Sequence, residues 1–270
     1  MTNFDKIRNY YQHFDEDNRL HNDASGRLEY EMTWRILEKY LPAQGRILDL
    51  GGATGVYSFP LAAKGYEVYL ADLSEELIWK AKAKDKDGLL KGCDVVNATD
   101  LSRYEDAFFD AVLAFGPFYH LMAEPERRAA AREISRVLKP GGQVLAAFIP
   151  FLAGSIAIVD RYVRRPEQVD VQRLEHVFAT GQFSNLEDIG FQEGYYAESG
   201  EMQNLFAAFG FDTVCIRSIR GFAYEREERI CSIEDAAMRD KVFELMEATA
   251  DRKEIVETCG HAVYIGKKPM

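Results

Sequence analysis

A carboxylate and a glycine-rich turn stand together in the stretch ILDLGGATG. Asp49 lies in the apolar run, and Gly51, Gly52 and Gly55 follow it. Glycines let a ligand approach the backbone, and a helix after the turn would point its first N–H groups at that ligand. Asp72, at the end of the next apolar run, can accept hydrogen bonds from both hydroxyls of a ribose. The pattern therefore predicts a site for a cofactor that contains adenosine.

The charge of Asp49 separates two classes of cofactor. Dinucleotides bind through a G-x-G-x-x-G turn that faces a pyrophosphate, and the turn GGATG does not have that spacing. A carboxylate would repel a pyrophosphate, whereas it would attract a ligand that carries a sulfonium and an ammonium group. We therefore expect S-adenosylmethionine rather than NAD.

Short apolar runs and amphipathic helical patterns alternate along most of the chain. We expect strands at residues 47–50, 66–72, 93–98, 110–116, 143–149, 213–219 and 261–269. Nearly continuous apolar strands between helices are typical of a parallel sheet covered on both faces, and right-handed crossovers make it doubly wound. Pro60 lies inside the first helix after the turn and should kink that helix or delay its start.

The alternation stops after Pro150 and resumes near residue 199. The segment between is rich in Tyr, Phe, Arg and Gln, with helical patterns at 155–165 and 171–179. A stretch of this length is seldom a bare loop, so we expect an insertion with structure of its own. The expected parts are a helical lid segment (1–45), a Rossmann-like core (46–150 and 199–270) and a cap insertion over the substrate site (151–198).

The composition argues against several classes of function. Of the 270 residues 47% are hydrophobic and 29% charged, and the net charge is −11. Such a surface repels nucleic acids and anionic membranes, and the basic stretch DRYVRRPE is explained at least as well by a solvated helix face. No apolar run approaches the roughly 20 residues of a membrane span. The N-terminus lacks a signal-peptide core, so we expect a cytoplasmic protein. The four cysteines form no C-x-x-C pair, so we expect neither a metal site nor a disulfide framework.

Five motifs follow one another along the chain: ILDLGGATG, LADLS, VVNATDL, FDAVLAFGPFYHL and ISRVLKPGGQVLAAF. In order and spacing they resemble the motifs of class I S-adenosylmethionine-dependent methyltransferases, over about residues 45–150. The resemblance implies an α/β fold with a doubly wound, Rossmann-like sheet of seven strands in the order 3-2-1-4-5-7-6, the last strand antiparallel. It implies S-adenosylmethionine as the cofactor and leaves the methyl acceptor open.

The resemblance places the glycine-rich turn around the methionine part of the cofactor. Asp49 and Gly51 would line that part, and Gly52, Ala53 and Gly55 would complete the turn. Ala53 stands where many members of the family carry glycine. We expect it to be tolerated with a negative φ, in a narrower turn.

Later strands would hold the adenosine at their ends. By resemblance, Asp72 would bind the ribose hydroxyls and Leu73 would pack on the adenine. Asn97 and Ala98 resemble the pair that recognises the adenine edge. Phe115 would place its backbone near the methionine amine.

The region before the first strand resembles the glycine N-methyltransferase group. In that group an arginine at the start of a helix pairs with the cofactor carboxylate, and by position this would be Arg27. A planar guanidinium suits a carboxylate because it binds both oxygens. Tyr10 or Tyr11 would cover the sulfonium through a cation–aromatic contact. The alternative is that Arg27 is a helix-end charge and that the two tyrosines only pack.

Methyl transfer is an in-line displacement that needs alignment and exclusion of water, and it needs a base only if the acceptor must lose a proton. Tyr119 and His120 follow the fourth strand and are the candidate catalytic residues. His120 is either a base near neutral pH or a buried or capping residue. Other aromatic and histidine residues are expected in the roof of the acceptor site, the core of the insertion or the surface: Phe183, Tyr195, Tyr196, His13, His21 and His176.

A lid and an insertion over the cofactor would close the pocket, which suits small molecules better than polymers. We therefore expect a small-molecule acceptor with an N, O or S nucleophile. A methyltransferase for RNA or protein is the first alternative, although GPFYHL matches neither sequence signature common in RNA methyltransferases. A non-catalytic protein that binds S-adenosylmethionine is the second. The sequence does not indicate an oligomeric state.

Overall fold

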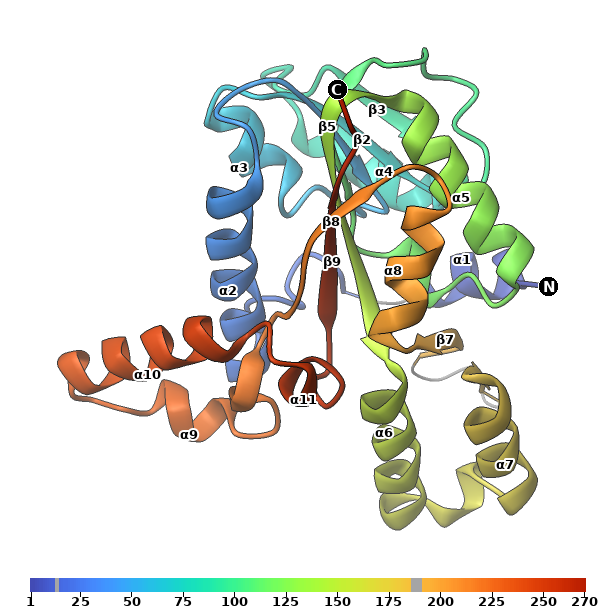
Figure 1. Ribbon diagram of the computed structural model, residues 1–270, viewed down its shortest axis with the longest axis vertical. Helices are drawn as coiled ribbons and strands as arrows, with labels where there is room; N and C mark the ends of the chain where they lie inside the picture. Colours follow the sequence, from blue (N-terminus) through green and yellow to red (C-terminus); the bar gives the residue numbers. More distant parts are fainter. Residues whose placement is uncertain (13–14, 186–190) are drawn as a thin grey trace.

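The computed structural model describes residues 1–12, 15–185 and 191–270, and a twisted sheet runs through its centre (Figure 1). Seven of its 9 described strands follow the order β3-β2-β1-β4-β5-β9-β8. They are β1 (Arg46–Leu50), β2 (Glu67–Asp72), β3 (Gly92–Val95), β4 (Phe109–Ala114), β5 (Leu138–Pro150), β8 (Asp212–Ser218) and β9 (Ala262–Lys267). β1 to β5 are parallel, and β9 is antiparallel to β5 and β8. Because β8 and β9 are the sixth and seventh of these strands along the chain, the predicted order 3-2-1-4-5-7-6 is confirmed.

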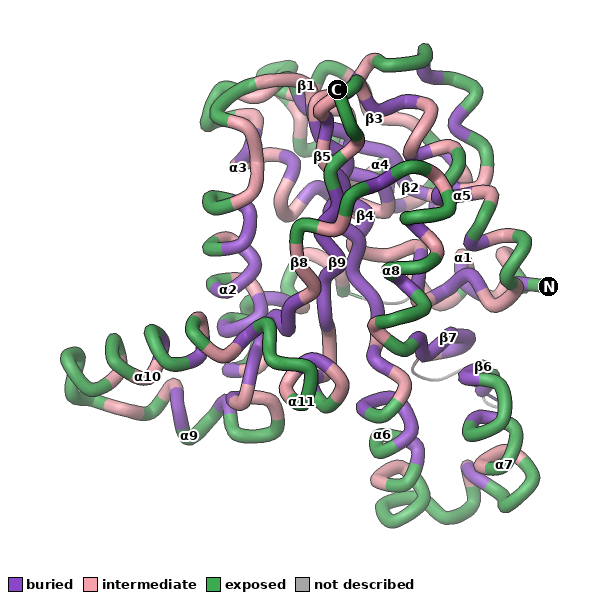
Figure 2. Tube along the Cα trace, viewed as in Figure 1, coloured by how far each residue is buried: buried purple, intermediate pink, exposed green. Residues whose placement is uncertain are grey.

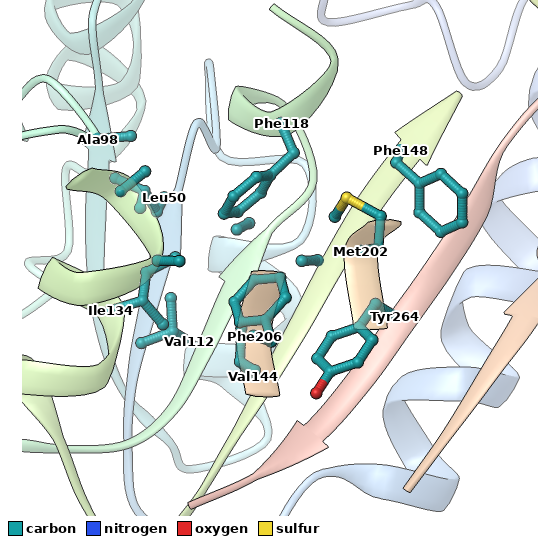
Figure 3. Close-up of a cluster of buried hydrophobic side chains, with 14 of the residues drawn as sticks. Leu50, Ala98, Val112, Phe118, Ile134, Val144, Phe148, Met202, Phe206 and Tyr264 are labelled. Atoms are coloured by element: carbon teal, nitrogen blue, oxygen red, sulfur yellow. The ribbon is translucent and has the colours of Figure 1, made fainter. Parts of the chain in front are cut away.

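Helices pack on both faces of this sheet (Figures 1 and 2). Successive strand residues point to opposite faces, so Val112 packs with α5 (Glu124–Val137) and α8 (Ser199–Ala207), as Figure 3 shows. Leu113 belongs to the cluster on the other face, with α2 (Ala24–Tyr40) and α10 (Ala236–Thr249). The other helical elements of the core and N-terminal region are α1 (Phe4–Gln12), α3 (Ser58–Ala63), α4 (Glu75–Lys84), α9 (Glu227–Cys231), α11 (Lys253–Val256), η1 (Pro117–Tyr119) and η3 (Gly221–Ala223).

Pro60 delays the helix that follows the glycine-rich turn. α3 begins only at Ser58, and Pro60 lies in its first turn, where a missing N–H breaks no helical hydrogen bond. Residues 53–57 form turns. The helix predicted to start directly at the glycines is therefore replaced by turns, and the predicted delay is confirmed.

The segment after β5 forms two helices and a hairpin. The predicted helical pieces are present as α6 (Phe151–Arg164) and α7 (Val171–Thr180), with η2 (Pro166–Gln168) between them, and the two helices extend away from the sheet (Figure 1). The hairpin of β6 (Gln182–Ser184) and β7 (Glu193–Ala197) is not expected from the sequence, because its strands are short. β7 also pairs in parallel with the end of β5, at Ile149 and Pro150. The hairpin thereby attaches the insertion to the edge of the sheet where the parallel strands end.

Ala53 adopts a left-handed backbone conformation, with a φ of 50°. The prediction of a negative φ is therefore wrong. The reason lies in the neighbouring strand end, because the Ala53 N–H donates a hydrogen bond to Asp72 Oδ2 at 2.9 Å, which fixes the turn.

Replacing Ala53 by glycine should raise the free energy of unfolding by up to about 1 kcal/mol. A residue with a Cβ is disfavoured by about 1–2 kcal/mol in this region, and the flexibility of glycine in the unfolded chain offsets part of the gain. Denaturant titration of the purified variant measures the difference. Gly51→Ala, at a φ of 77°, should lower stability under the same conditions. A less stable Ala53→Gly protein would contradict strain in the turn.

Candidate functional site

A cavity of about 250 Å³ opens where β1, β2 and β4 end. Parallel strands end at one edge of a sheet, so the residues that follow them meet there. The predicted site residues that line this cavity are Tyr11, Asp49, Gly51, Gly52, Ala53, Asp72, Leu73, Asn97, Ala98, Phe115, Tyr119 and His120. Gly55 and Arg27 do not line it.

Each glycine of the glycine-rich turn is required for a different structural reason. Gly51 has a φ of 77°, which favours glycine. A Cβ on Gly52 would lie 2.3 Å from Leu70 Cδ1 and 2.6 Å from Asp49 Oδ2, so only backbone fits there. Gly55 also has a positive φ, and a Cβ on it would meet the Phe59 ring at 2.8 Å. Gly55 therefore shapes the turn from outside the cavity.

Asp49 is a buried carboxyl group beside the turn. It is 1% exposed, and its Oδ2 accepts a hydrogen bond from Ser58 Oγ at 2.6 Å. Burial raises the pKa of Asp49 to about 6, with the nearby Asp72 adding to the rise and the Ser58 bond opposing it. Asp49 is therefore mostly ionised at pH 7. Since it forms no ion pair with any described residue, its charge is available to a cationic ligand.

Asp72 holds the turn and the start of α4 together. Its Oδ2 accepts from the Ala53 N–H, and its Oδ1 accepts from the Ser74 N–H at 2.8 Å. Burial raises the pKa of Asp72, and these backbone hydrogen bonds oppose the rise. Each carboxylate oxygen can accept two hydrogen bonds. Asp72 can therefore bind a diol without losing its structural contacts.

Asn97 and Ala98 reach the cavity from the end of β3. Asn97 Oδ1 accepts hydrogen bonds from the N–H and the hydroxyl of Thr99, both at 3.0 Å, so this oxygen shapes the local turn. The Asn97 amide group and the Ala98 backbone remain for a ligand. Across the cavity, the Phe115 ring makes an edge-to-face contact with Tyr57, with centroids 5.7 Å apart.

Arg27 lies outside the cavity, contrary to the prediction. The buried stripe of α2 contains Leu28, Met32 and Ile36, so the helical period leaves Arg27 on the exposed face. Its guanidinium donates a hydrogen bond to the His21 carbonyl oxygen at 3.4 Å. Two arginines line the cavity: Arg8 on α1, which pairs with Asp5, and Arg19 in the segment before α2.

Arg19 belongs to a chain of charged side chains centred on the buried Glu29. Its guanidinium lies 3.0 Å from Glu29 Oε1 and 3.5 Å from Glu16 Oε2. Glu29 also contacts His261 Nδ1 at 3.1 Å and Arg220 Nε at 3.7 Å. Burial alone would raise the pKa of Glu29, but His261, Arg19 and Arg220 hold it well below its usual range. Glu29 thus stays ionised and fixes Arg19 at the cavity wall.

Tyr11 and His120 form a hydrogen-bonded pair in the cavity wall. Tyr11 Oη lies 2.8 Å from His120 Nε2, and His120 Nδ1 lies 3.0 Å from the Glu193 carbonyl oxygen. A carbonyl oxygen only accepts, so Nδ1 carries the hydrogen and Nε2 accepts from the Tyr11 hydroxyl. Burial lowers the pKa of His120 to about 4, opposed by the Glu193 bond. Of the two alternatives for His120, the structure therefore favours the buried, hydrogen-bonded one, in which the imidazole is neutral at neutral pH.

Three residues that the sequence did not single out complete this end of the cavity: Ile149, Phe191 and His261. The Tyr119 ring stacks on the His261 ring with centroids 5.6 Å apart. The Phe191 ring packs against the His120 ring, with centroids 5.2 Å apart. Because Phe191 follows the hairpin loop and His261 precedes the last strand, neither belongs to a local motif.

The other aromatic candidates serve packing. Phe183 and Tyr196 lie in the core of the insertion, and Tyr195 lies in the main core, under the Arg127 guanidinium. None of the three lines the cavity. His21 and His176 are exposed, and His13 lies outside the described residues.

α1 forms one wall of the cavity, and hydrogen bonds near both ends of this helix hold it in place. Phe4, Ile7 and Tyr10 line the wall. Before and within α1, the Asn3 N–H donates to Glu193 Oε2 at 3.0 Å, and Lys6 Nζ donates to the Asn185 carbonyl oxygen at 2.6 Å. Beyond α1, Asp17 accepts hydrogen bonds from Thr54 and Lys84. The N-terminal segment thus connects the insertion to the glycine-rich turn.

Comparison with known proteins agrees with this site. Residues 48–146 match the model of a methyltransferase domain. A solved S-adenosylmethionine-dependent methyltransferase from Methanosarcina mazei has the same fold, with a TM-score of 0.60 over 87% of this chain and 97% of that one, at 21% identity. Residues 48–146 therefore belong to a methyltransferase domain, and the fold is that of class I S-adenosylmethionine-dependent methyltransferases. S-adenosylmethionine is the cofactor of this class, as predicted.

Curated relatives of this methyltransferase domain differ in the acceptor that their names give. The tRNA 5-carboxymethoxyuridine methyltransferase of Escherichia coli K12 is 28% identical over 153 residues, which is 54% of this chain and 56% of that protein. The demethylmenaquinone methyltransferase of Clavibacter sepedonicus is 34% identical over 150 residues, 53% and 54% of the two chains. The chain spans about half the length of the curated relatives it matches. Across the described ranges, every helix is too short or too polar to cross a bilayer.

Proposed function

We propose that this protein transfers the methyl group of S-adenosylmethionine to a nitrogen, oxygen or sulfur atom of a small molecule. The supporting observation is that one cavity is lined by two chemically different sets of side chains. We assign the first end of the cavity, for the cofactor, to the carboxylates of Asp49 and Asp72. We assign the acceptor end to the aromatic residues Tyr11, Tyr119 and His120.

The proposed cofactor contacts follow from the charges at the first end. Asp49 faces the cationic groups of the cofactor, and Asp72 binds the ribose hydroxyls. Arg19 takes the place predicted for Arg27 and binds the cofactor carboxylate, because Glu29 fixes its guanidinium at the cavity wall, whereas Arg8, which also lines the cavity, pairs with Asp5 near the start of α1. Gly55 contributes only the shape of the turn.

Binding of S-adenosylmethionine should weaken as the pH falls through about 6. The pKa of Asp49 is raised to about 6 in the free protein, so the carboxylate that attracts the cofactor is present above that pH and is lost below it. The loss is at most about tenfold for each pH unit. Calorimetric titrations at a series of pH values measure it.

Asp49→Asn is the control for this pH dependence. This variant should bind S-adenosylmethionine weakly at every pH. Any pH dependence of binding that remains would come from Glu16 and Asp72, whose pKa values burial also raises. An unchanged slope in Asp49→Asn would contradict the assignment of Asp49.

The proposed acceptor is small and uncharged where it enters the cavity. Tyr119, Phe191 and Ile149 offer aromatic and aliphatic surface, and α1 covers the cavity from the side. The net charge of −11 disfavours an RNA acceptor, although one relative is named as a tRNA methyltransferase.

When bound, the cofactor supplies a methyl group that is already activated for displacement. The protein then has to orient the nucleophile and exclude water, and it has to accept a proton where the nucleophile must lose one. The Tyr11 hydroxyl donates its hydrogen to His120 Nε2, so the pair can relay a proton from the acceptor through the Tyr11 oxygen to Nε2. As that proton reaches Tyr11, the Tyr11 hydrogen moves to His120. The low pKa of His120 keeps Nε2 free of a proton over the physiological pH range.

A screen with tritium-labelled methyl donor over phenols, thiols and amines tests the proposed function. With an acceptor found by the screen, Tyr11→Phe should lower kcat about 100-fold, the lower end of the effect of general base catalysis. Tyr162→Phe, on the exposed side of α6, is the matched control and should be unaffected. Binding of the cofactor without transfer to any acceptor would favour the non-catalytic alternative.

A further inference from the structure

A second groove, lined by arginines, lies between the insertion and the segment after η3. Its volume is about 380 Å³. The residues that line it are Ala157, Asp160, Arg161, Arg164, Arg165, Gln168, Tyr224 and Glu225. None of them lines the cofactor cavity.

The three arginines of this groove lack counter-ions. In residues 1–12, 15–185 and 191–270, no carboxylate oxygen lies within 4.0 Å of the guanidinium nitrogens of Arg161, Arg164 or Arg165. Other arginines of this acidic chain do pair, as Arg46 does with Glu67 at 2.9 Å and Arg136 with Asp106 at 2.7 Å. Unpaired guanidinium groups around a groove present charge-assisted donors to an anion.

Two short paths of packed residues connect the groove to the cofactor cavity. The Arg161 guanidinium lies 5.1 Å from the centre of the Phe183 ring, which stacks on Phe191 with centroids 6.2 Å apart. Phe191 lines the cofactor cavity. On the other wall, Tyr224 packs so closely on Gly260 that a Cβ there would meet its ring at 2.5 Å. Gly260 precedes His261, which also lines the cavity.

Charge and shape define the ligand of the groove. Its arginines outweigh the carboxylates of Asp160 and Glu225 by one positive charge. Guanidinium groups bind pairs of phosphate oxygens well. Glu225 holds a left-handed φ of 63°, a strained conformation for a residue with a Cβ, at the rim of the groove. Two carboxylates beside the arginines disfavour a long polyanion and tolerate a single phosphate or pyrophosphate group.

We propose that this groove binds the phosphate or pyrophosphate group of a small molecule. In the form that rests on the proposed function, that molecule is the methyl acceptor, whose phosphate lies in the groove beside the acceptor end of the cavity. In the other form it is a separate effector. Both forms require the same chemistry at Arg164 and Arg165.

Calorimetric titration with pyrophosphate at low ionic strength tests the groove. The double variant R164Q/R165Q should bind pyrophosphate at least about tenfold more weakly than the native chain. Arg132→Gln removes an equally exposed arginine on α5 and should leave binding unchanged. The absence of pyrophosphate binding, or an equal loss in Arg132→Gln, would overturn the proposal. Single-stranded RNA that binds through the same arginines while pyrophosphate does not would overturn it in favour of a polymer.

Two further measurements are needed. The first distinguishes a phosphate on the methyl acceptor from a separate effector, and the second tests the phosphate site independently of the proposed methyltransferase function. Pyrophosphate that competes with the acceptor in the methyl-transfer assay would identify the phosphate as part of the acceptor, and a lack of competition would identify an effector. Binding of S-adenosylhomocysteine should be the same in the native chain and R164Q/R165Q, which also shows that the variant is folded. If the native chain binds pyrophosphate but no S-adenosylhomocysteine, the proposed function fails and the phosphate site stands.

Discussion

Asp72→Ala should weaken the binding of S-adenosylhomocysteine by about tenfold to a hundredfold. A hydrogen bond to a charged group contributes on the order of 1.5–3 kcal/mol, and Asp72 would lose its bonds to the ribose. The substitution also releases the Ala53 and Ser74 N–H groups, so the turn that faces the cofactor loses its support. Isothermal titration calorimetry gives the change in affinity.

Two companion variants separate the ligand contact from the support of the turn. Asp72→Asn keeps one acceptor oxygen and the size of the side chain, so its affinity for S-adenosylhomocysteine should lie between those of the native chain and Asp72→Ala. Asp87→Ala removes an exposed carboxylate after α4 and should bind normally. Native affinity in Asp72→Ala would remove Asp72 from the cofactor site.

Arg19→Met should reduce both stability and cofactor binding, whereas Arg27→Met should change neither. Without Arg19, Glu16 loses its guanidinium partner, and Glu29 keeps only His261 and Arg220. Breaking a buried ion pair is strongly destabilising. The Arg19 side chain is 35% exposed, so we expect a smaller loss, on the order of 2 kcal/mol.

Thermal unfolding with and without S-adenosylhomocysteine distinguishes the two roles of Arg19. A purely structural arginine would lower the melting temperature but leave the ligand-induced increase intact. If Arg19 binds the cofactor carboxylate, that increase should also shrink in Arg19→Met and partly return in Arg19→Lys. A larger binding defect in Arg27→Met would restore the assignment made from the sequence.

The sequence predicted the residues of the site that belong to contiguous motifs. Asp49 and Asp72 stand at the ends of β1 and β2, and Asn97 follows β3, so local pattern and sheet topology together bring them to one edge. Arg19 carried no such signal, because it stands in a polar stretch without periodicity. Its position depends on Glu29 and on His261, which comes 232 residues after Glu29.

Other differences arise from tertiary contacts that a local pattern does not contain. The left-handed φ of Ala53 is set by a hydrogen bond from another strand end. The low pKa of His120 results from burial beneath β7, a strand that the sequence did not indicate. Arg27 is predicted to bind the cofactor from its position along the sequence alone, whereas the helical period of α2 decides which face of the helix it occupies.

The position of β9 has a consequence for synthesis on the ribosome. This strand lies between β5 and β8, although residues 262–267 are translated after both of them. Until β9 emerges, the edge of β5 at residues 143–148 stays unpaired and β8 has no neighbour in the sheet. Glu29 also lacks its contact with His261 until that residue is translated. A nascent chain stalled before residue 261 should therefore bind nascent-chain chaperones at these exposed strands and should not yet retain the cofactor.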